Sequence, residues 1–169
     1  MGILEDLRAK VQRVNEGLTN GELVRDVVVQ HPTDILELQR YQLLEGKTGK
    51  GDDIRPYYSE DLKPGGRFYS VETAGRYAAM KQDITYPYSV NRNPDAPNLY
   101  FNGKFHDEIG VQFNATTLSI IGTTAYAKGI IAKYGEDTFG LSEEKWEIIF
   151  DDRGALNELM NSLKTILYG

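Results

Sequence analysis

The stretch EIGVQFNATTLSIIGT, residues 108–123, is the part of the chain with the clearest strand pattern. Polar and apolar side chains alternate within it on both sides of a short break, Asn114-Ala115-Thr116. Alternation with a period of two is typical of strands that bury one face, and a short polar break suits a turn between them. We therefore predict two strands, 108–113 and 117–123, that pair as a hairpin.

Apolar side chains at helical spacing mark most of the remaining chain. The segments predicted to be helical are 3–18, 71–82, 125–134, a helix that Ser142 would cap, and 156–167. Gly154 costs about 1 kcal/mol relative to alanine inside a helix, so we expect a break there. The run 22–30 fits either a strand or a short buried helix, and 34–44 is interpreted as a short strand ending in a turn. We interpret the apolar stripe of 156–167 as part of the core.

These elements together predict an α+β fold, with a small antiparallel sheet, helices packed on one face and an elaborated loop region. The chain of 169 residues suits a single domain, 1–169. Within it we distinguish an N-terminal helical segment (1–30), a loop-rich insertion (46–96) and C-terminal helices (142–169). Five of the six prolines lie between positions 56 and 100, which makes a continuous buried sheet there improbable.

The composition excludes several classes of protein. The net charge of -6 argues against a strong electrostatic footprint on nucleic acid, although an acidic lining would let DNA pass through a ring without trapping its phosphates. The absence of cysteine excludes disulfides and thiolate metal sites, and it suits a reducing cytoplasm. We find no apolar run of signal-peptide or membrane-helix length, so we expect a soluble protein with no membrane partner.

Motifs that would carry catalysis or cofactor binding fail on their spacing. The segment EGKTGKG, 45–51, resembles a phosphate-binding loop, but Tyr41 stands where that loop requires its first glycine. His31 and His106 are too far apart in sequence to form a recognised metal-ligand motif. Neighbouring acidic residues do not face the same way on a helix or strand, which weakens the pairs Asp52-Asp53, Glu143-Glu144 and Asp151-Asp152 as metal ligands. We therefore predict no catalytic residue, no cofactor and no bound metal.

Tyrosines in the loop region are the candidate contact residues. Seven of the eleven tyrosines lie between positions 56 and 100, and tyrosine suits half-exposed surfaces that meet a partner. We predict the 46–66 loop as a contact surface, and the individual protein-interface candidates are Arg55, Tyr57, Tyr58, Tyr86 and Tyr88. The alternative is that these tyrosines form a lid over a small core.

Five segments follow one another in an order that is informative as a set. They are DILELQRYQLLEGK (34–47), IRPYYS (54–59), AGRYAAMK (74–81), PNLYFNGKF (97–105) and KYGEDTFGLSEE (133–144). Their order and spacing, over about residues 34–169, resemble a small neck or tail-completion structural protein of tailed bacteriophages, crAss-like phages included. The chain departs from that pattern at Asn102, where threonine is more usual, at Lys104, where an acidic residue is usual, and in a longer insertion at 60–95.

The resemblance implies a non-enzymatic virion protein, assembled in the host cytoplasm, that forms a ring at the head-tail junction (the neck) or in the tail. The implied partners are further copies of the chain in a cyclic ring and other virion proteins, such as portal, adaptor or tail proteins. DNA would at most pass through a channel, without sequence-specific binding. The first alternative is a monomeric cytosolic protein-binding module, and the second is a hydrolase with unconventional carboxylates.

Two interpretations remain for 98–107. Asn102-Gly103 between apolar runs indicates a type I′ hairpin. The resemblance implies instead a short helix that leads into the strand ending at Phe113. In that helix the inward-pointing side chains would be Leu99, Phe101 and Phe105.

Overall fold

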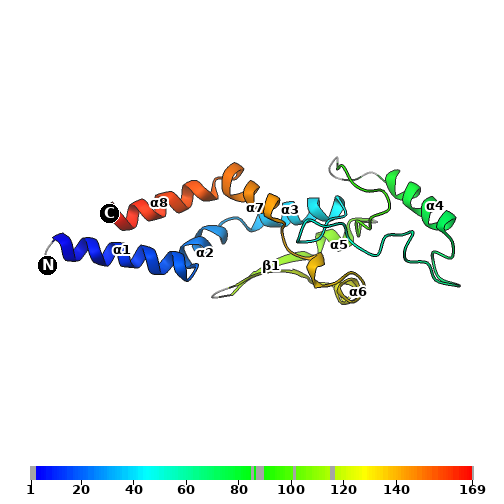
Figure 1. Ribbon diagram of the computed structural model, residues 1–169, viewed down its shortest axis with the longest axis horizontal. Helices are drawn as coiled ribbons and strands as arrows, with labels where there is room; N and C mark the ends of the chain where they lie inside the picture. The colour runs from blue at the N-terminus through cyan, green and yellow to red at the C-terminus, as the bar shows by residue number, and fades with distance from the viewer. Residues whose placement is uncertain (1–2, 85, 87–89, 101, 115–116, 169) are drawn as a thin grey trace.

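The computed structural model describes residues 3–84, 86, 90–100, 102–114 and 117–168. Within these ranges it contains eight α-helices and one two-stranded antiparallel sheet, so the predicted α+β class is confirmed. The molecule is elongated (Figure 1). A central body holds the sheet, two helices leave the body together at one end, and the loop region lies at the other end.

The elements follow one another in this order. The first helices are α1 (Ile3–Thr19), α2 (Glu22–Val28), α3 (Pro32–Leu44), α4 (Val71–Gln82) and α5 (Lys104–Asp107). The strands are β1 (Ile109–Phe113) and β2 (Leu118–Gly122). After them come α6 (Ala125–Tyr134), the 3-10 turn η1 (Glu136–Thr138), α7 (Glu143–Glu147), the π-helical turn η2 (Ile148–Asp152) and α8 (Ala155–Tyr168). Within the described ranges, no helix has the length and apolar character needed to cross a membrane.

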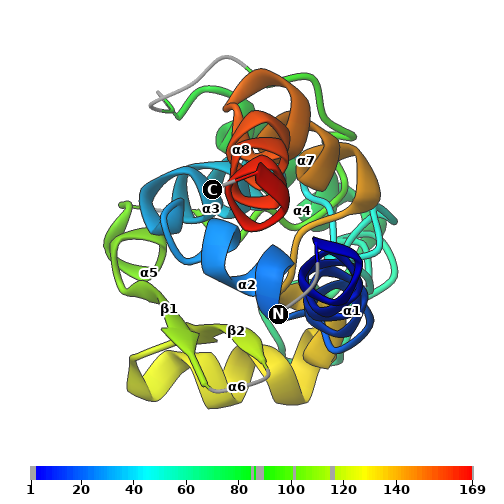
Figure 2. The same ribbon diagram turned by 90° about the vertical axis from the view of Figure 1, so that its left-hand side faces the viewer.

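The hairpin forms as its alternating pattern predicts. β1 pairs with β2 in antiparallel register, with Val111 opposite Ile120. Helix α3 contacts β1, and helix α6 contacts β2 (Figure 2). Gly122 permits the second of these contacts, because a Cβ at that position would lie 2.5 Å from the Cβ of Ala127. A larger residue there would push α6 away from the sheet.

The predicted helices are confirmed, and the open choice at 22–30 is resolved as the short helix α2. Gly154 has a φ of 86° between η2 and α8, so the predicted break is confirmed as well. A left-handed backbone is strained for residues with a side chain, which explains the glycine.

The prediction of a strand at 34–44 is wrong, because this segment belongs to helix α3. Pro32 occupies the start of the helix, where its fixed φ fits and its missing N–H is not needed. Six positions of α3 are buried; Leu44 is one, and the other five are spaced as on one helix face, namely Ile35, Leu38, Gln39, Gln42 and Leu43. Two of these five are glutamines, so hydrophobicity alone does not show the helical period.

Residues 98–107 match neither interpretation fully. Helix α5 covers only Lys104–Asp107, and Gly103, with φ 83°, lies at its N-terminal end. In the described residues around Asn102-Gly103 no strand flanks the pair on both sides, so the hairpin interpretation is wrong. Leu99 and Phe105 pack against the core as expected, whereas Phe101 lies outside the described residues.

The core consists of two clusters. The main cluster lies in the body and joins α2, α3, the hairpin and the C-terminal segment, with Ile35, Leu43 and Ile149 fully buried. A smaller cluster lies under α4. Its members are Tyr58, Phe68, Ala74 and Ala78.

Candidate functional site

The segment EGKTGKG forms a hydrogen-bonded turn after α3. The Thr48 N–H donates to the Asp52 carbonyl at 2.8 Å, and Lys47 pairs with Asp53 across the turn. The Gly49 N–H donates to the carbonyl of Asp137 at 2.6 Å, which ties the turn to the segment after α6. The next helix begins only at Val71, whereas a phosphate-binding loop leads directly into a helix. The turn therefore does not have the architecture of a nucleotide site.

The side chain of Gln42, on α3, holds this turn in place through hydrogen bonds. Its Nε2 donates to the carbonyls of Thr48 and Gly140, each at 2.8 Å, and its Oε1 accepts from the Ser142 N–H at 2.9 Å. The side chain is buried, so these bonds are shielded from water. One residue of α3 thus holds together two segments that are almost a hundred residues apart in sequence.

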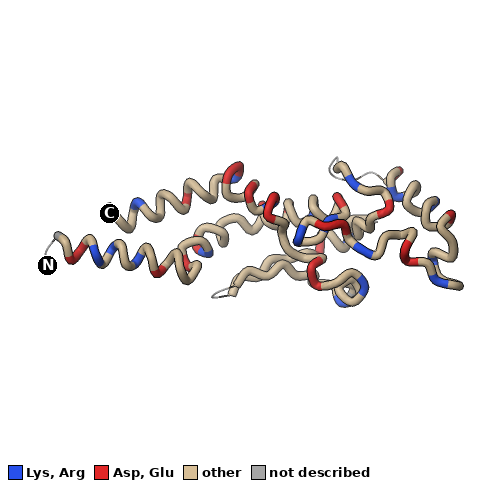
Figure 3. The backbone as a smooth tube through the Cα atoms, viewed as in Figure 1, with Lys and Arg blue, Asp and Glu red and all other residues tan. Residues whose placement is uncertain are grey.

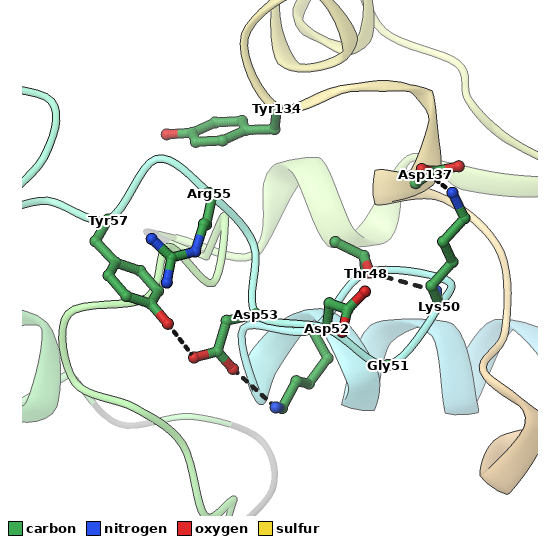
Figure 4. A pocket seen from close by; sticks show the side chains of 10 residues that line it. Thr48, Lys50, Gly51, Asp52, Asp53, Arg55, Tyr57, Tyr134 and Asp137 are labelled. Atoms are coloured by element: carbon green, nitrogen blue, oxygen red, sulfur yellow. Dashed lines mark hydrogen bonds and ion pairs between the residues drawn. The ribbon is translucent and has the colours of Figure 1, made fainter.

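The turn forms one wall of a polar pocket of about 650 Å³ (Figure 4). The other walls come from Arg55 and Tyr57 on one side and from Tyr134 and Asp137 on the other. We call this the polar pocket. Three cationic and three acidic side chains line it, so the pairing among them decides what it can bind.

Each cation lining the polar pocket is paired with a carboxylate. Lys47 Nζ lies 2.7 Å from Asp53 Oδ1, and Lys50 Nζ lies 2.6 Å from Asp137 Oδ2. Arg55 forms an ion pair with Glu60 outside the pocket, and its guanidinium lies 4.0 Å from the centre of the Tyr57 ring. These pairs neutralise the cations that a phosphate would need.

Asp53 is the centre of the pairing. Burial acts to raise the pKa of its carboxyl, but hydrogen bonds from Lys47, Tyr57 and Asn93 outweigh burial and lower that pKa from 3.8 to about 2. The Tyr57 hydroxyl donates to Asp53 Oδ2 at 2.6 Å, and this bond raises the pKa of Tyr57. Asp53 therefore stays ionised at neutral pH, where it would be a poor proton donor. The polar pocket stabilises the turn.

Replacing Asp53 with asparagine should lower the free energy of unfolding by about 2 kcal/mol at neutral pH, since each pKa unit corresponds to ~1.4 kcal/mol. The folded-state pKa lies below the unfolded value. The stabilisation is therefore present above the unfolded pKa and lost as pH falls toward 2. Urea unfolding of wild type and Asp53→Asn should converge as the pH is lowered.

Asp52→Asn is the matched control, because Asp52 is an adjacent exposed carboxylate in the same turn. It should change the free energy of unfolding by less than ~0.5 kcal/mol. A difference between wild type and Asp53→Asn that is independent of pH would contradict the role of the charge.

The two histidines are both buried, and each makes contacts within the protein. His31 lies between α2 and α3, with Nδ1 3.0 Å from Asp34 Oδ2 and Nε2 3.3 Å from Glu158 Oε2. The hydrogen bond to Asp34 is the largest influence that raises the pKa of His31. Burial lowers the pKa of His106 to about 4. Among the described residues, no three His, Cys, Asp or Glu side chains form a group that could hold a metal ion.

The predicted interface residues that the structure describes lie in different surroundings. Arg55 and Tyr57 both line the polar pocket, whereas Tyr86 is half-buried and Tyr88 lies outside the described residues. Tyr58 is only 6% exposed, which corrects the expectation that its side chain lies on the surface.

Tyr58 is buried because helix α4 needs a large partner. The fully or nearly buried apolar positions of α4 are Ala74 and Ala78, which are too small to fill a core alone. The rings of Tyr58 and Phe68 fill the space, with their centroids 5.6 Å apart. Tyr58 therefore covers a small core, as in the alternative interpretation that the loop tyrosines form a lid.

Helices α1 and α8 project from the body at one end of the molecule. They leave the body side by side and antiparallel, so that the two ends of the chain lie near each other (Figures 1 and 2). We call this pair the helical arm. Figure 3 shows that acidic and basic residues are spread along α1, whereas α8 carries few.

The helical arm leaves apolar side chains in water. Leu4, Val11 and Leu18 are seven residues apart, so they form one row along α1, and Leu4 is 74% exposed. Leu156 and Met160, one turn apart on α8, are each 45% exposed. The interpretation of the 156–167 stripe as core is therefore corrected, because Ala155 is the buried residue of α8 and the rest of the stripe is at most partly covered.

A second apolar surface lies where α2 meets the hairpin. A groove of about 380 Å³ is lined by Val24 and Val28 from α2, by Phe113 and Leu118 from the hairpin, and by Trp146 and Phe150. Arg25 also lines it and pairs with Asp26 at 2.7 Å. We call this the apolar groove. Sequence patterns did not reveal it, since its walls come from three separate segments.

No known family model, curated protein or solved structure matches this chain. Function is therefore inferred from the surface itself. The polar pocket is internally paired, whereas the helical arm and the apolar groove expose apolar side chains. Large exposed apolar patches mark sites of association.

Proposed function

We propose that this protein is a non-enzymatic structural component of a tailed-phage virion, which forms a ring at the head-tail junction or in the tail. The helical arm is the observation that carries the proposal, because it presents apolar rows to water at one end of the molecule. The order of segments, which resembles neck and tail-completion proteins, supports the virion setting. The proposed site of action is the virion, with assembly in the host cytoplasm.

The helical arm offers apolar side chains for association. Its exposed large apolar side chains are Leu4, Leu7, Val11, Leu18, Leu156, Met160 and Tyr168. Each of them leaves 44–83% of its surface in water. Burial of this area against neighbouring copies would supply the stabilisation that holds a ring together.

The charge of the chain is compatible with such a ring. With a net charge of -6, the protein would not bind DNA strongly through its overall charge. DNA would therefore pass through the channel without being trapped. The other proposed partners are virion proteins above and below the ring, such as portal, adaptor or tail proteins.

The mass of the purified protein in solution tests the proposal. Light scattering should give several times the chain mass of 19.1 kDa, and negative-stain electron micrographs should show rings. The double variant Leu7→Glu, Val11→Glu should shift the protein to 19.1 kDa, because it would place two charges in the contact. The concentration needed for half-assembly should rise more than tenfold per charge, since tenfold corresponds to ~1.4 kcal/mol.

Val71→Glu is the matched control. Val71 is 64% exposed at the start of α4, at the opposite end of the molecule from the arm. This variant should assemble like the wild type. A wild-type protein that stays at 19.1 kDa at every concentration, without rings in micrographs, would overturn the proposal.

The apolar groove favours a second candidate function, that of a monomeric cytosolic protein-binding module. A groove of this kind suits the apolar face of a partner helix. This alternative predicts a monomeric wild-type protein, so the same mass measurement separates the two functions.

A further inference from the structure

We propose that a site beside helix α4 binds a small dianionic oxyanion of the phosphate class. The site consists of Lys81 on α4, Arg67 in the loop before that helix and Arg92 in the loop after it. We call these three residues the cationic site. Helix α4 lies in the loop region, at the opposite end of the molecule from the helical arm (Figure 1). This inference goes beyond the proposed function and does not depend on it.

Lys81 is a buried lysine without a counter-charge from the protein. Its residue is 2% exposed, and no carboxylate within the described ranges forms an ion pair with it. The other buried lysine, Lys145, has a partner, because its Nζ lies 3.1 Å from Glu45 Oε2. Burying an unpaired charge is costly, so a buried ammonium group is normally accompanied by an anion. A bound anion would provide Lys81 with the partner that Lys145 finds in the chain.

Two arginines are brought to Lys81 through tyrosine rings. The guanidinium carbon of Arg67 lies 4.6 Å from the centre of the Tyr77 ring, and Tyr77 lies one turn before Lys81 on α4. The guanidinium carbon of Arg92 lies 5.7 Å from the centre of the Tyr86 ring. The Tyr86 hydroxyl donates to the Lys81 carbonyl. Both arginines therefore place positive charge near Lys81.

The contacts of the two arginines do not cancel their charge. An aromatic ring positions a guanidinium group but carries no net charge. Arg92 Nη1 donates to the Ala96 carbonyl at 3.2 Å, and Arg67 Nη1 lies 3.4 Å from the Tyr77 hydroxyl, so these partners are neutral as well. In the part of the chain that the structure describes, neither arginine forms an ion pair. The cationic site is thus the reverse of the polar pocket, where every cation has a carboxylate.

The charges of the site favour a dianion. Burial, together with the charges of Arg92 and Arg67, lowers the pKa of Lys81 from 10.5 to about 8, so its ammonium form still predominates at pH 7. Arginine is also charged at this pH, and its planar fork of donors fits the oxygens of phosphate. Three positive charges are balanced better by a doubly charged oxyanion than by a single carboxylate.

A second buried donor near the site has no acceptor. Asn98 is fully buried, and its Nδ2 makes no hydrogen bond with the described residues. Its carbonyl lies 3.2 Å from His106 Nε2. Burial, with further contributions from the charges of Arg40 and Lys81, lowers the pKa of that histidine to about 4. This part of the molecule therefore has more donors than acceptors, and an oxyanion offers only acceptors.

The burial of Lys81 also limits the size of the ligand. A small ion can reach an ammonium group that is almost covered, whereas the backbone of a DNA duplex is too bulky to do so. Arg67 is exposed, so it marks the side of the site that is open to solvent. The ligand is therefore inorganic phosphate or a small phosphate monoester.

Thermal unfolding in inorganic phosphate tests the site. At pH 7 and constant ionic strength, sodium phosphate should raise the unfolding midpoint of the wild type until the site is saturated. Lys81→Met should weaken phosphate binding at least tenfold, because it removes the central charge. In phosphate-free buffer the same variant should unfold at a higher temperature than the wild type, because an apolar side chain replaces an unpaired buried charge. A merely structural role of Lys81 would give the opposite shift.

Lys128→Met is the matched control, because Lys128 is an exposed lysine on α6. Phosphate should stabilise this variant as much as the wild type. Phosphate also stabilises folded proteins in a non-specific way, so the difference between Lys81→Met and Lys128→Met gives the result. Arg67→Gln changes an exposed side chain and keeps the buried lysine, and it should weaken phosphate binding several-fold in a calorimetric titration of the folded protein.

Three outcomes would overturn the inference. The first is a wild type whose midpoint does not respond to phosphate, and the second is an equal response of the wild type and the Lys81→Met and Arg67→Gln variants. The third is equal stabilisation by sodium acetate at the same ionic strength, which would contradict the preference for a dianion. None of these outcomes bears on the ring, which the mass in solution tests separately.

Discussion

Replacing Gln42 with methionine should lower the free energy of unfolding by about 2–5 kcal/mol, because it leaves buried backbone groups without partners at ~1–3 kcal/mol each. The Gly140 carbonyl and the Ser142 N–H lose the bonds that Gln42 provides. The Thr48 carbonyl keeps a second donor, the Gly51 N–H at 2.9 Å. Methionine fills a similar volume, so the loss reports the hydrogen bonds rather than a cavity.

Urea unfolding followed by the fluorescence of Trp146, the single tryptophan, measures this effect. Gln30→Met is the matched control, because Gln30 is exposed and its Nε2 makes only a 3.5 Å contact with the Asp26 carbonyl. The control should change the free energy of unfolding by less than ~0.5 kcal/mol. A loss of less than ~1 kcal/mol for Gln42→Met would show that the turn holds without this side chain.

Ile149→Ala should be the second strongly destabilising change, with an expected loss of about 2–5 kcal/mol. Ile149 is fully buried in the main core, and it lies in η2, which leads into α8. The substitution removes apolar contacts and leaves a cavity that the rigid surroundings fill only in part. Because η2 connects the arm to the body, this residue also helps to fix where the arm leaves the core.

The urea midpoint of Ile149→Ala should fall while the slope stays constant, as expected for a loss of native stability. Val71→Ala is the control, since Val71 is an exposed apolar residue that should change stability by less than ~0.5 kcal/mol. A similar midpoint for the two variants would mean that the Ile149 site collapses onto neighbouring side chains.

The polar pocket and the two apolar surfaces have different roles. The pocket is closed by its own ion pairs and stabilises the turn after α3. The arm and the groove are the surfaces whose apolar side chains remain for a partner. Gln42→Met should therefore change the free energy of unfolding, whereas an assembly variant such as Leu7→Glu should change the mass in solution.

Local sequence patterns determined the hairpin, most helices and the break at Gly154. Each of these depends on residues within a few positions of one another, through side-chain alternation, helical spacing or the left-handed backbone that glycine permits. Tyr41, at the position where a phosphate-binding loop requires glycine, likewise excludes such a loop from the local sequence alone. The α+β class follows from the same local signals.

Tertiary structure alone decided the remaining features, because they depend on contacts between distant segments. Gln39 and Gln42 look like surface residues until the backbone of Gly140 and Ser142, about a hundred positions away, supplies their partners. Tyr58 is buried because the buried apolar positions of α4 are both alanines, and its ring packs beside the rings of Phe68 and Tyr77. The stripe of α8 has the pattern of a core helix, yet Leu156 and Met160 are exposed and its other members are only half-buried, because the arm leaves the body. An apolar stripe shows that a helix needs a partner, and only the arrangement in space shows whether the same chain provides it.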